Sequence, residues 1–224
     1  MSNMHQWIIC AAVLSLSAGT AAADKYEIGF ASGTRWMRSG SVDTLTADDA
    51  HGSVGLGGAI RLEGIRPFGF DLYVDGDYTY EGLSGTTYQR IDTDLSMHAF
   101  RAGVRAEHDL EPWLSTFGRM TLGYTTAALS VTDQFSSVSR PTSDRAHAGT
   151  SSLGGGLNVR VIRSSRVTIV VRTELDYTKV SSLHFQASPE MSDDGVLTIP
   201  VMAASLGDVD VSGLSLRFGL VGQF

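Results

Sequence analysis

The chain has 224 residues, of which 42% are apolar, and its formal net charge at pH 7 is −7. This length is enough for one domain of about two hundred residues after an export signal. The negative charge, without a basic stripe to neutralise phosphates, excludes nucleic acid as an expected partner. Glycine is abundant, with 25 residues, whereas the only lysines are Lys25 and Lys179.

The N-terminal segment predicts export. Trp7–Leu16 is an apolar run too short to span a bilayer as a helix, and small residues ending in Ala21-Ala22-Ala23 follow it, as at a signal-peptidase site. We therefore expect residues 1–23 to be a signal peptide and residues 24–224 to be the mature domain; a retained anchor is the alternative. Cys10, the single cysteine, lies in the signal, so we expect no thiol chemistry in the mature chain.

Eight segments of about eleven residues alternate apolar and polar side chains with a period of two, as strands do. In chain order they cover residues 26–36, 54–64, 70–80, 96–106, 114–124, 153–163, 167–177 and 214–224. Eleven residues match a strand tilted across a bilayer, and the mature sequence has no apolar run long enough for a membrane helix. A closed barrel also satisfies every backbone polar group in lipid. The sequence predicts an all-β, eight-stranded, antiparallel, up-and-down transmembrane β-barrel.

The predicted connections alternate between short and long. The short ones are tight turns at residues 66–69, around 111–112 and at 163–166. The long ones are polar loops at about residues 37–53, 81–95, 125–152 and 178–213. Outer-membrane barrels show this asymmetry, with periplasmic turns and extracellular loops.

Aromatic residues on the apolar strand faces form two bands. The predicted girdle residues are Tyr26, Trp36, Phe70, Tyr80, Trp113, Tyr124 and Tyr177. Bands ten residues apart on tilted strands are separated by roughly 25 Å, the height of a lipid-facing belt. A soluble barrel, the alternative, has no reason to sort its aromatic side chains by height.

The opposite strand faces are charged and are predicted to line the lumen. These residues are Glu27, Arg61, Glu63, Asp71, Asp75, Asp77, Arg101, Arg105, Glu107, Arg119, Arg160, Arg172, Glu174, Asp176 and Arg217. The planar guanidinium group of arginine bridges carboxylates well in a packed network, and eight strands leave an interior that side chains can fill. We expect a structural ion-pair network; the alternative is an ion path in which the partners exchange.

The last strand is apolar on one face and ends in an aromatic residue. Leu216, Phe218, Leu220 and Phe224 carry this pattern, which resembles the C-terminal assembly signal of bacterial outer-membrane barrels. The whole mature chain resembles the small eight-stranded barrels, namely the barrel of outer membrane protein A, the X-type proteins and the opacity-type, porin-like group. This resemblance implies a Gram-negative outer-membrane location. It also implies partners in membrane lipid, lipopolysaccharide and the barrel assembly machinery.

No residues form a convincing catalytic or metal site. The only His-x-Ser pair, His51-Gly52-Ser53, opens the second predicted strand, whereas the pattern of the lipid A deacylases needs such a pair on a late strand. The other histidines of the mature chain, at His98, His108, His147 and His184, lack metal-ligand spacing. We expect no enzymatic activity, no cofactor and no metal.

The long loops are the best candidates for a binding role. Residues 178–213 contain an apolar stretch, Val196–Met202, that would extend a hairpin, plug the barrel or bind a ligand. Asp193-Asp194-Gly195 is a weak candidate for calcium. The prediction is a non-enzymatic, porin-like or structural envelope protein with surface loops. A narrow ion channel and a lipid A hydrolase are the alternatives.

Overall fold

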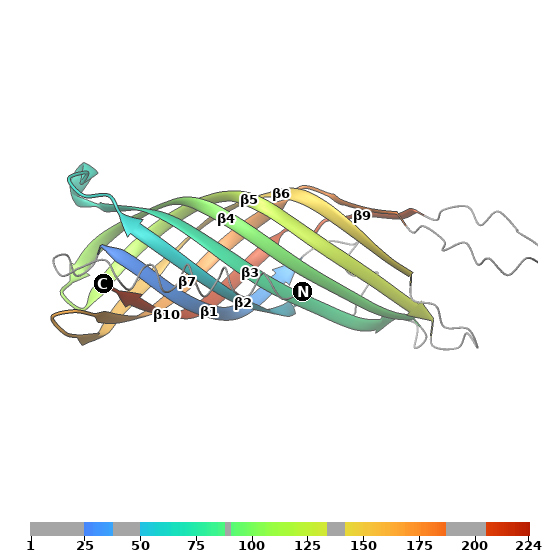
Figure 1. The fold of residues 1–224 in the computed structure, drawn as a ribbon, viewed down its shortest axis with the longest axis horizontal. Helices are drawn as coiled ribbons and strands as arrows, with labels where there is room; N and C mark the ends of the chain where they lie inside the picture. Colours follow the sequence, from blue (N-terminus) through green and yellow to red (C-terminus); the bar gives the residue numbers. More distant parts are fainter. Residues whose placement is uncertain (1–24, 38–49, 88–90, 134–141, 187–204) are drawn as a thin grey trace, which may run out of the picture.

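The computed structural model describes residues 25–37, 50–87, 91–133, 142–186 and 205–224 (Figure 1). Eight antiparallel strands close into a barrel in the order β1-β10-β7-β6-β5-β4-β3-β2, and β8 and β9 form a separate two-stranded sheet. The elements are β1 (Tyr26–Met37), β2 (Ala50–Arg61), η2 (Pro67–Gly69), β3 (Asp71–Thr87), β4 (Ile91–Glu111), β5 (Leu114–Asp133), β6 (Thr142–Arg163), β7 (Thr168–Val180), β8 (Leu183–Gln186), β9 (Ser205–Val209) and β10 (Gly213–Gln223). The predicted eight-stranded antiparallel barrel is confirmed. The predicted signal peptide and the segments Asp193-Asp194-Gly195 and Val196–Met202 lie outside the described residues.

The two ends of the barrel differ. The short turns β2–β3, β4–β5 and β6–β7 lie at one end together with the C-terminus, and the β8–β9 hairpin lies at the other (Figure 1). We call these the short-turn end and the long-loop end. No helix in the described part of the chain is long and apolar enough to cross a membrane.

Four neighbouring strands are far longer than predicted. β3 to β6 contain 17, 21, 20 and 22 residues, whereas β1, β2, β7 and β10 contain 11 to 13. The predicted loops at residues 81–95 and 125–152 are therefore wrong over most of their length. Their described parts continue the ladder, with Leu83 opposite Leu95 and Leu129 opposite Asp144. The many small polar residues look like loop composition, although their side chains alternate between the two faces.

The second strand also begins and ends earlier than predicted. β2 starts at Ala50 and stops at Arg61, because the chain turns where Gly64 has a φ of +77°. Phe68 and Gly69 have φ values of +53° and +83°, in the left-handed region that ends a strand. The predicted tight turn at 66–69 is present as η2.

Glycine lets neighbouring strands approach closely inside the barrel. A Cβ atom on Gly103 would lie 2.0 Å from the carbonyl oxygen of Met120, and one on Gly123 would lie 2.0 Å from that of Phe100. Both distances are far below van der Waals contact, so β4 and β5 can coil together here only because these residues lack a side chain.

The middle of the outer surface is apolar. Its large exposed side chains include Ile28, Phe30, Leu56, Val74, Phe100, Val104, Met120, Leu122, Leu153, Leu157, Leu175, Phe218 and Leu220. Of the predicted girdle residues, Tyr26 is half-buried and the other six are exposed on this surface: Trp36, Phe70, Tyr80, Trp113, Tyr124 and Tyr177. A soluble barrel faces water with polar side chains and packs apolar ones inside. The middle of this barrel shows the reverse arrangement.

The polarity of the two faces reverses along the long strands. In the middle of β4 the lumen side carries Arg101 while the outside carries Phe100. Towards the long-loop end, buried Leu95 and Met97 face inwards and exposed Asp94 faces outwards. The ends of these strands therefore follow the pattern of a barrel in water, whereas the middle follows the pattern of a barrel in lipid.

Candidate functional site

The lumen of the barrel contains the most unusual chemistry of the molecule. Its inward side chains form three layers from the short-turn end to the long-loop end. The lower charge cluster consists of Glu27, Arg105, Glu107 and Arg172. The central charge cluster consists of Asp75, Asp77, Arg101, Arg119, Glu174, Asp176 and Arg217. The third layer, which we call the apolar cap, consists of Met37, Leu83, Leu95, Met97, Ala127, Leu129, Ala146, Ala148, Val180, Leu183, Phe185, Val209 and Val211.

Glu27 organises the lower charge cluster. Its carboxylate lies 2.6 Å from Nη2 of Arg105 and 3.0 Å from Nη2 of Arg172, and it accepts a hydrogen bond of 2.8 Å from Gln223. Glu107 lies 3.6 Å from Arg105 and accepts a 2.5 Å hydrogen bond from the hydroxyl of a buried serine, Ser115. Together with Ser115 and Gln223, the cluster therefore joins β1, β4, β5, β7 and β10.

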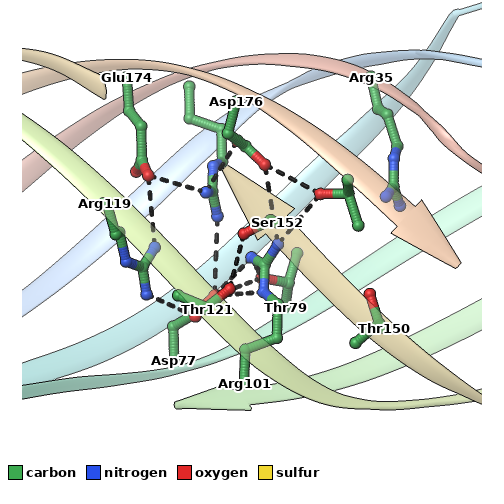
Figure 2. A network of polar contacts seen from close by, with 12 residues as sticks. Arg35, Asp77, Thr79, Arg101, Arg119, Thr121, Thr150, Ser152, Glu174 and Asp176 are labelled. Atoms are coloured by element: carbon green, nitrogen blue, oxygen red, sulfur yellow. Dashed lines mark hydrogen bonds and ion pairs between the residues drawn. The ribbon is translucent and has the colours of Figure 1, made fainter. Parts of the chain in front are cut away.

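Asp77 organises the central charge cluster in the same way, by pairing with several arginines (Figure 2). Its Oδ2 lies 2.5 Å from Nη2 of Arg101, and its Oδ1 lies 2.7 Å from Nη2 of Arg119. Arg217 lies 3.7 Å from Asp77 and also contacts Glu174 at 3.2 Å. Each arginine thus bridges carboxylates from different strands, which is the geometry that the planar guanidinium group favours.

Hydroxyl groups lie between the central charge cluster and the apolar cap. Arg101 donates to Thr79 at 3.0 Å and to Thr178 at 3.4 Å, and the Thr121 and Ser152 hydroxyls are 2.6 Å apart (Figure 2). These groups fill the barrel with short side chains and extend the polar network upwards.

The apolar cap closes the long-loop end. Four side chains of the cap are each 2% exposed or less, namely Leu183 and Phe185 of β8, Val209 of β9 and Val211. They pack against inward residues of the long strands β3 to β6. The outer side of the same hairpin is polar, since exposed His184 and Asp208 pair with each other. The expectation that residues 178–213 form a polar loop is therefore wrong for the described part.

The hairpin is tied to the rim through one acidic residue. Asp210 accepts hydrogen bonds from the hydroxyl and backbone N–H of Ser212 and lies 3.2 Å from Nζ of Lys179. Partial burial raises the pKa of Asp210, but these hydrogen bonds and the nearby lysine outweigh burial and hold the pKa below its ordinary value.

The structure brings most of the predicted lumen residues together. Eleven of the fifteen lie in the two clusters defined above. Arg61, Asp71 and Arg160 lie lower, in a cavity at the short-turn end. The placement of Glu63 in the lumen is wrong: β2 ends before it, and its exposed side chain pairs with Lys25 at 3.3 Å.

Sequence reasoning missed a buried pair above the central cluster. Arg35 lies 2.6 Å from Glu81, and both are almost fully buried. Arg35 shares its strand face with Glu27, so parity indicated its position. Glu81 was missed because β3 was predicted to end at Tyr80.

The described histidines lie on both faces of the barrel. His51 and Ser53 are buried on the lumen side of β2. His98 lies on the outer surface, where its Nδ1 is 2.7 Å from the Tyr78 hydroxyl, and His147 stacks on Tyr124. Among the described residues, no group of three His, Cys, Asp or Glu side chains is arranged to hold a metal ion.

The predicted assembly residues lie on the outer face of the closing strand. Phe218 and Leu220 are exposed, whereas Leu216 and Phe224 are half-buried. The backbone N–H of Phe224 donates to Tyr26 at 2.9 Å, so the last residue helps to close the barrel against β1.

No family model matches the sequence, and no curated protein sequence does. Among solved structures, Neisserial surface protein A is 12% identical with a TM-score of 0.50, and the match covers 92% of this chain and 100% of that chain. Ail, the attachment invasion locus protein of Yersinia pestis, is 13% identical with a TM-score of 0.48, covering 90% and 99% of the two chains. OprG of Pseudomonas aeruginosa is 11% identical with a TM-score of 0.47, covering 92% and 98%.

The match to Neisserial surface protein A, at this low identity, concerns the fold alone. The chain has the fold of the small eight-stranded outer-membrane β-barrels. Within this class of fold, its lumen is filled by two charge clusters and covered by an apolar cap.

Proposed function

We propose that the protein is a non-enzymatic, integral barrel of the bacterial outer membrane that does not conduct ions and acts through its long-loop end. The observation that carries this proposal is the double closure of the lumen, by the central charge cluster and by the apolar cap. The reversal of face polarity along β3 to β6 supports the membrane location, because it marks a lipid-covered middle and a water-exposed end.

The charge clusters leave only a small cavity in the lumen. The cavity that touches both clusters has a volume of about 70 Å³, and Glu27 and Arg105, which line it, are almost fully buried. An ion moving through the lumen would have to displace paired side chains, each of which costs free energy when left buried without its partner. It would then meet the apolar cap, which offers no polar atoms to replace the hydration shell.

The partners follow from this placement. The apolar outer surface would contact membrane lipid and, at the long-loop end, lipopolysaccharide. The strand ending in Phe224 would engage the barrel assembly machinery, with Leu216, Phe218 and Leu220 presented on its outer face. An extracellular ligand would contact the β8–β9 hairpin and the segments of β3 to β6 nearest the long-loop end.

Two alternatives have different support. The narrow-channel alternative is favoured by Arg101, which lies near both Asp77 and Asp176 and could exchange between them. The lipid A hydrolase alternative has lost its candidate residues, since His51 and Ser53 face the lumen.

Planar bilayer recordings test the proposal. Four proteins are compared: the wild type, a cap variant with residues 183–209 replaced by a short Gly-Ser linker, a charge variant with Arg101→Ala and Arg172→Ala, and the combination. We expect discrete openings in the combination only, because each layer closes the lumen by itself. Openings in the wild type that change in size or selectivity in the charge variant would show that the narrow-channel alternative is correct.

A second measurement tests the absence of enzymatic activity. Lipid A from cells expressing the wild type is compared by mass spectrometry with lipid A from cells expressing His51→Ala. We expect the two spectra to match each other and that of cells without the protein. A mass change that needs His51 would contradict the proposal.

A further inference from the structure

A second cavity opens below the lower charge cluster, at the short-turn end of the barrel. Its volume is about 300 Å³, at the lower end of the range for small-molecule pockets. Four guanidinium groups and two carboxylates line it: Arg61, Arg66, Arg160, Arg163, Asp71 and Asp109. We call this cavity the vestibule.

The wall formed by β2 and β3 holds two arginines on one carboxylate. Nη2 of Arg61 lies 2.7 Å from Oδ2 of Asp71, and Nε of Arg66 lies 2.6 Å from Oδ1. Asp71 therefore pairs with both guanidinium groups and fixes them at the cavity. Arg66, whose side chain is 64% exposed, keeps further N–H donors for a ligand, because a guanidinium carries five.

The wall formed by β4 and β6 is built in the same way. Nη2 of Arg160 lies 2.6 Å from Asp109 and 3.6 Å from Glu107, and its Nη1 donates to the carbonyl oxygen of Pro112 at 3.3 Å. Arg163, the last residue of β6, is exposed and makes no ion pair within the described parts of the chain. On this wall the guanidinium group of Arg163 therefore offers its N–H donors to a ligand.

Two side chains next to the lower charge cluster, Tyr73 and Gln223, close the inner end of the vestibule. Tyr73 is buried and lies under the Arg105 guanidinium, and Gln223 is held by its hydrogen bond to Glu27. A ligand would therefore enter from the short-turn end and stop at these two side chains.

We propose that the vestibule binds a phosphate monoester or pyrophosphate group. Arg66 and Arg163, one on each wall, offer exposed guanidinium donors to the cavity, and a phosphate monoester carries a charge of about −1.5 to −2 at pH 7 with several acceptor oxygens. Arginine binds such groups with parallel hydrogen bonds, and the two aspartates hold the guanidinium groups in place. The site is independent of whether the lumen conducts.

Isothermal titration of the folded barrel in octyl glucoside, in a phosphate-free buffer, tests this site. The probe is inorganic pyrophosphate, and the variants are Arg163→Gln and, as a matched control, Arg166→Gln. Both arginines are exposed in the same turn, but only Arg163 lines the vestibule. We expect one site per barrel, at least tenfold weaker binding in Arg163→Gln and unchanged binding in Arg166→Gln. Heat-modifiable gel migration confirms that each variant is folded.

Two further probes distinguish the sources of the phosphate group. Glycerol 3-phosphate represents a free monoester, and glycerophosphoglycerol represents the diester of a lipid headgroup. Tighter binding of the monoester supports the proposal. Tighter binding of the diester, absence of heat with pyrophosphate, or equal weakening by Arg163→Gln and Arg166→Gln would each overturn it.

Discussion

The guanidinium of Arg105 lies 4.2 Å from the ring centroid of Tyr73, its cross-strand neighbour, while its Nη2 lies 2.6 Å from the Glu27 carboxylate. One side chain thus joins an aromatic face on β3 to an ion pair with β1, across the interior of the barrel. Because Arg105 is 1% exposed, both interactions take place without competition from bulk water.

Replacing Arg105 with alanine should destabilise the barrel strongly. The change leaves the Glu27 carboxylate buried beside Arg172 alone and removes the contact with Tyr73. We expect a loss of about 3–5 kcal/mol in the free energy of unfolding, the usual cost of breaking a buried ion pair. Urea unfolding in lipid vesicles, followed by tryptophan fluorescence, measures it.

The matched comparison is Arg105→Met combined with Arg172→Met and Glu27→Gln. Removing all three charges leaves Glu107 beside Arg160 at 3.6 Å and no other ion of the cluster without a partner, so most of the stability should return. If this triple variant is as unstable as Arg105→Ala, the ion pairs do not account for the loss.

Two glycines on neighbouring strands should respond differently to alanine. A Cβ atom on Gly103 would lie 2.0 Å from the Met120 carbonyl oxygen, whereas nothing lies within 4 Å of one on Gly118. Gly103→Ala should lower the yield of folded barrel severely, and Gly118→Ala should leave it unchanged. Heat-modifiable migration on gels reports both, and equal yields would argue against the close coiling of β4 and β5.

The position of the membrane along β5 can be tested with one charge at two heights. Leu122 lies in the apolar belt and Ser130 lies towards the long-loop end, both on the outer face. Leu122→Arg should cost about 2–4 kcal/mol in lipid vesicles, as expected near the middle of a bilayer, and Ser130→Arg should cost roughly 0–1 kcal/mol. Equal costs would contradict a membrane boundary between the two residues.

The apolar cap should hold the hairpin in place. Phe185→Ala removes a side chain that is 1% exposed, so the hairpin should open more often and be cut faster by proteases. His184→Ala, on the exposed side of the same strand, should leave the rate of cleavage unchanged. We expect the barrel itself to resist cleavage in both variants.

The contact between Asp210 and the rim predicts how the hairpin responds to acid. The pKa of Asp210 is lowered in the folded state, so its stabilising contribution is complete above the ordinary value near 4 and is lost as the pH falls through the folded value. A spin label at Ser182→Cys should therefore keep the same mobility from pH 7 to pH 5 and become more mobile only below about pH 4. With Asp210→Asn added, the acid-induced change should be much smaller.

The sequence predicted the middle of the barrel. Alternation is clear there because large apolar side chains such as Leu122 and Phe218 face outwards while charged ones such as Arg119 and Arg217 face the lumen. Most charged residues of the lumen could be assigned from this parity alone. Their pairing could not, because it depends on which strands meet across the interior.

The segments of β3 to β6 nearest the long-loop end were not predicted as strands, for a physical reason. Towards the long-loop end the outer face is polar, so the inward side chains, such as Leu95 and Ala127, are the apolar ones. If apolar side chains are expected on the outer face along the whole strand, these segments are mistaken for loops. The hairpin of β8 and β9 was missed because each strand is short and pairs only with the other.

The lower charge cluster also constrains the order in which the barrel forms. Glu27 lies on the first strand, β1, yet Gln223, which donates to it, lies on the last strand, β10, and Arg105 and Arg172 come from strands between them. Glu27 can therefore acquire all its partners only when the first and last strands have joined. Contacts this distant in sequence form late, so a barrel that is still open retains an incompletely paired carboxylate at its seam. The cluster thereby makes closure of the barrel cooperative, because the ion pairs of Glu27 stabilise the barrel fully only after the last strand has joined the first.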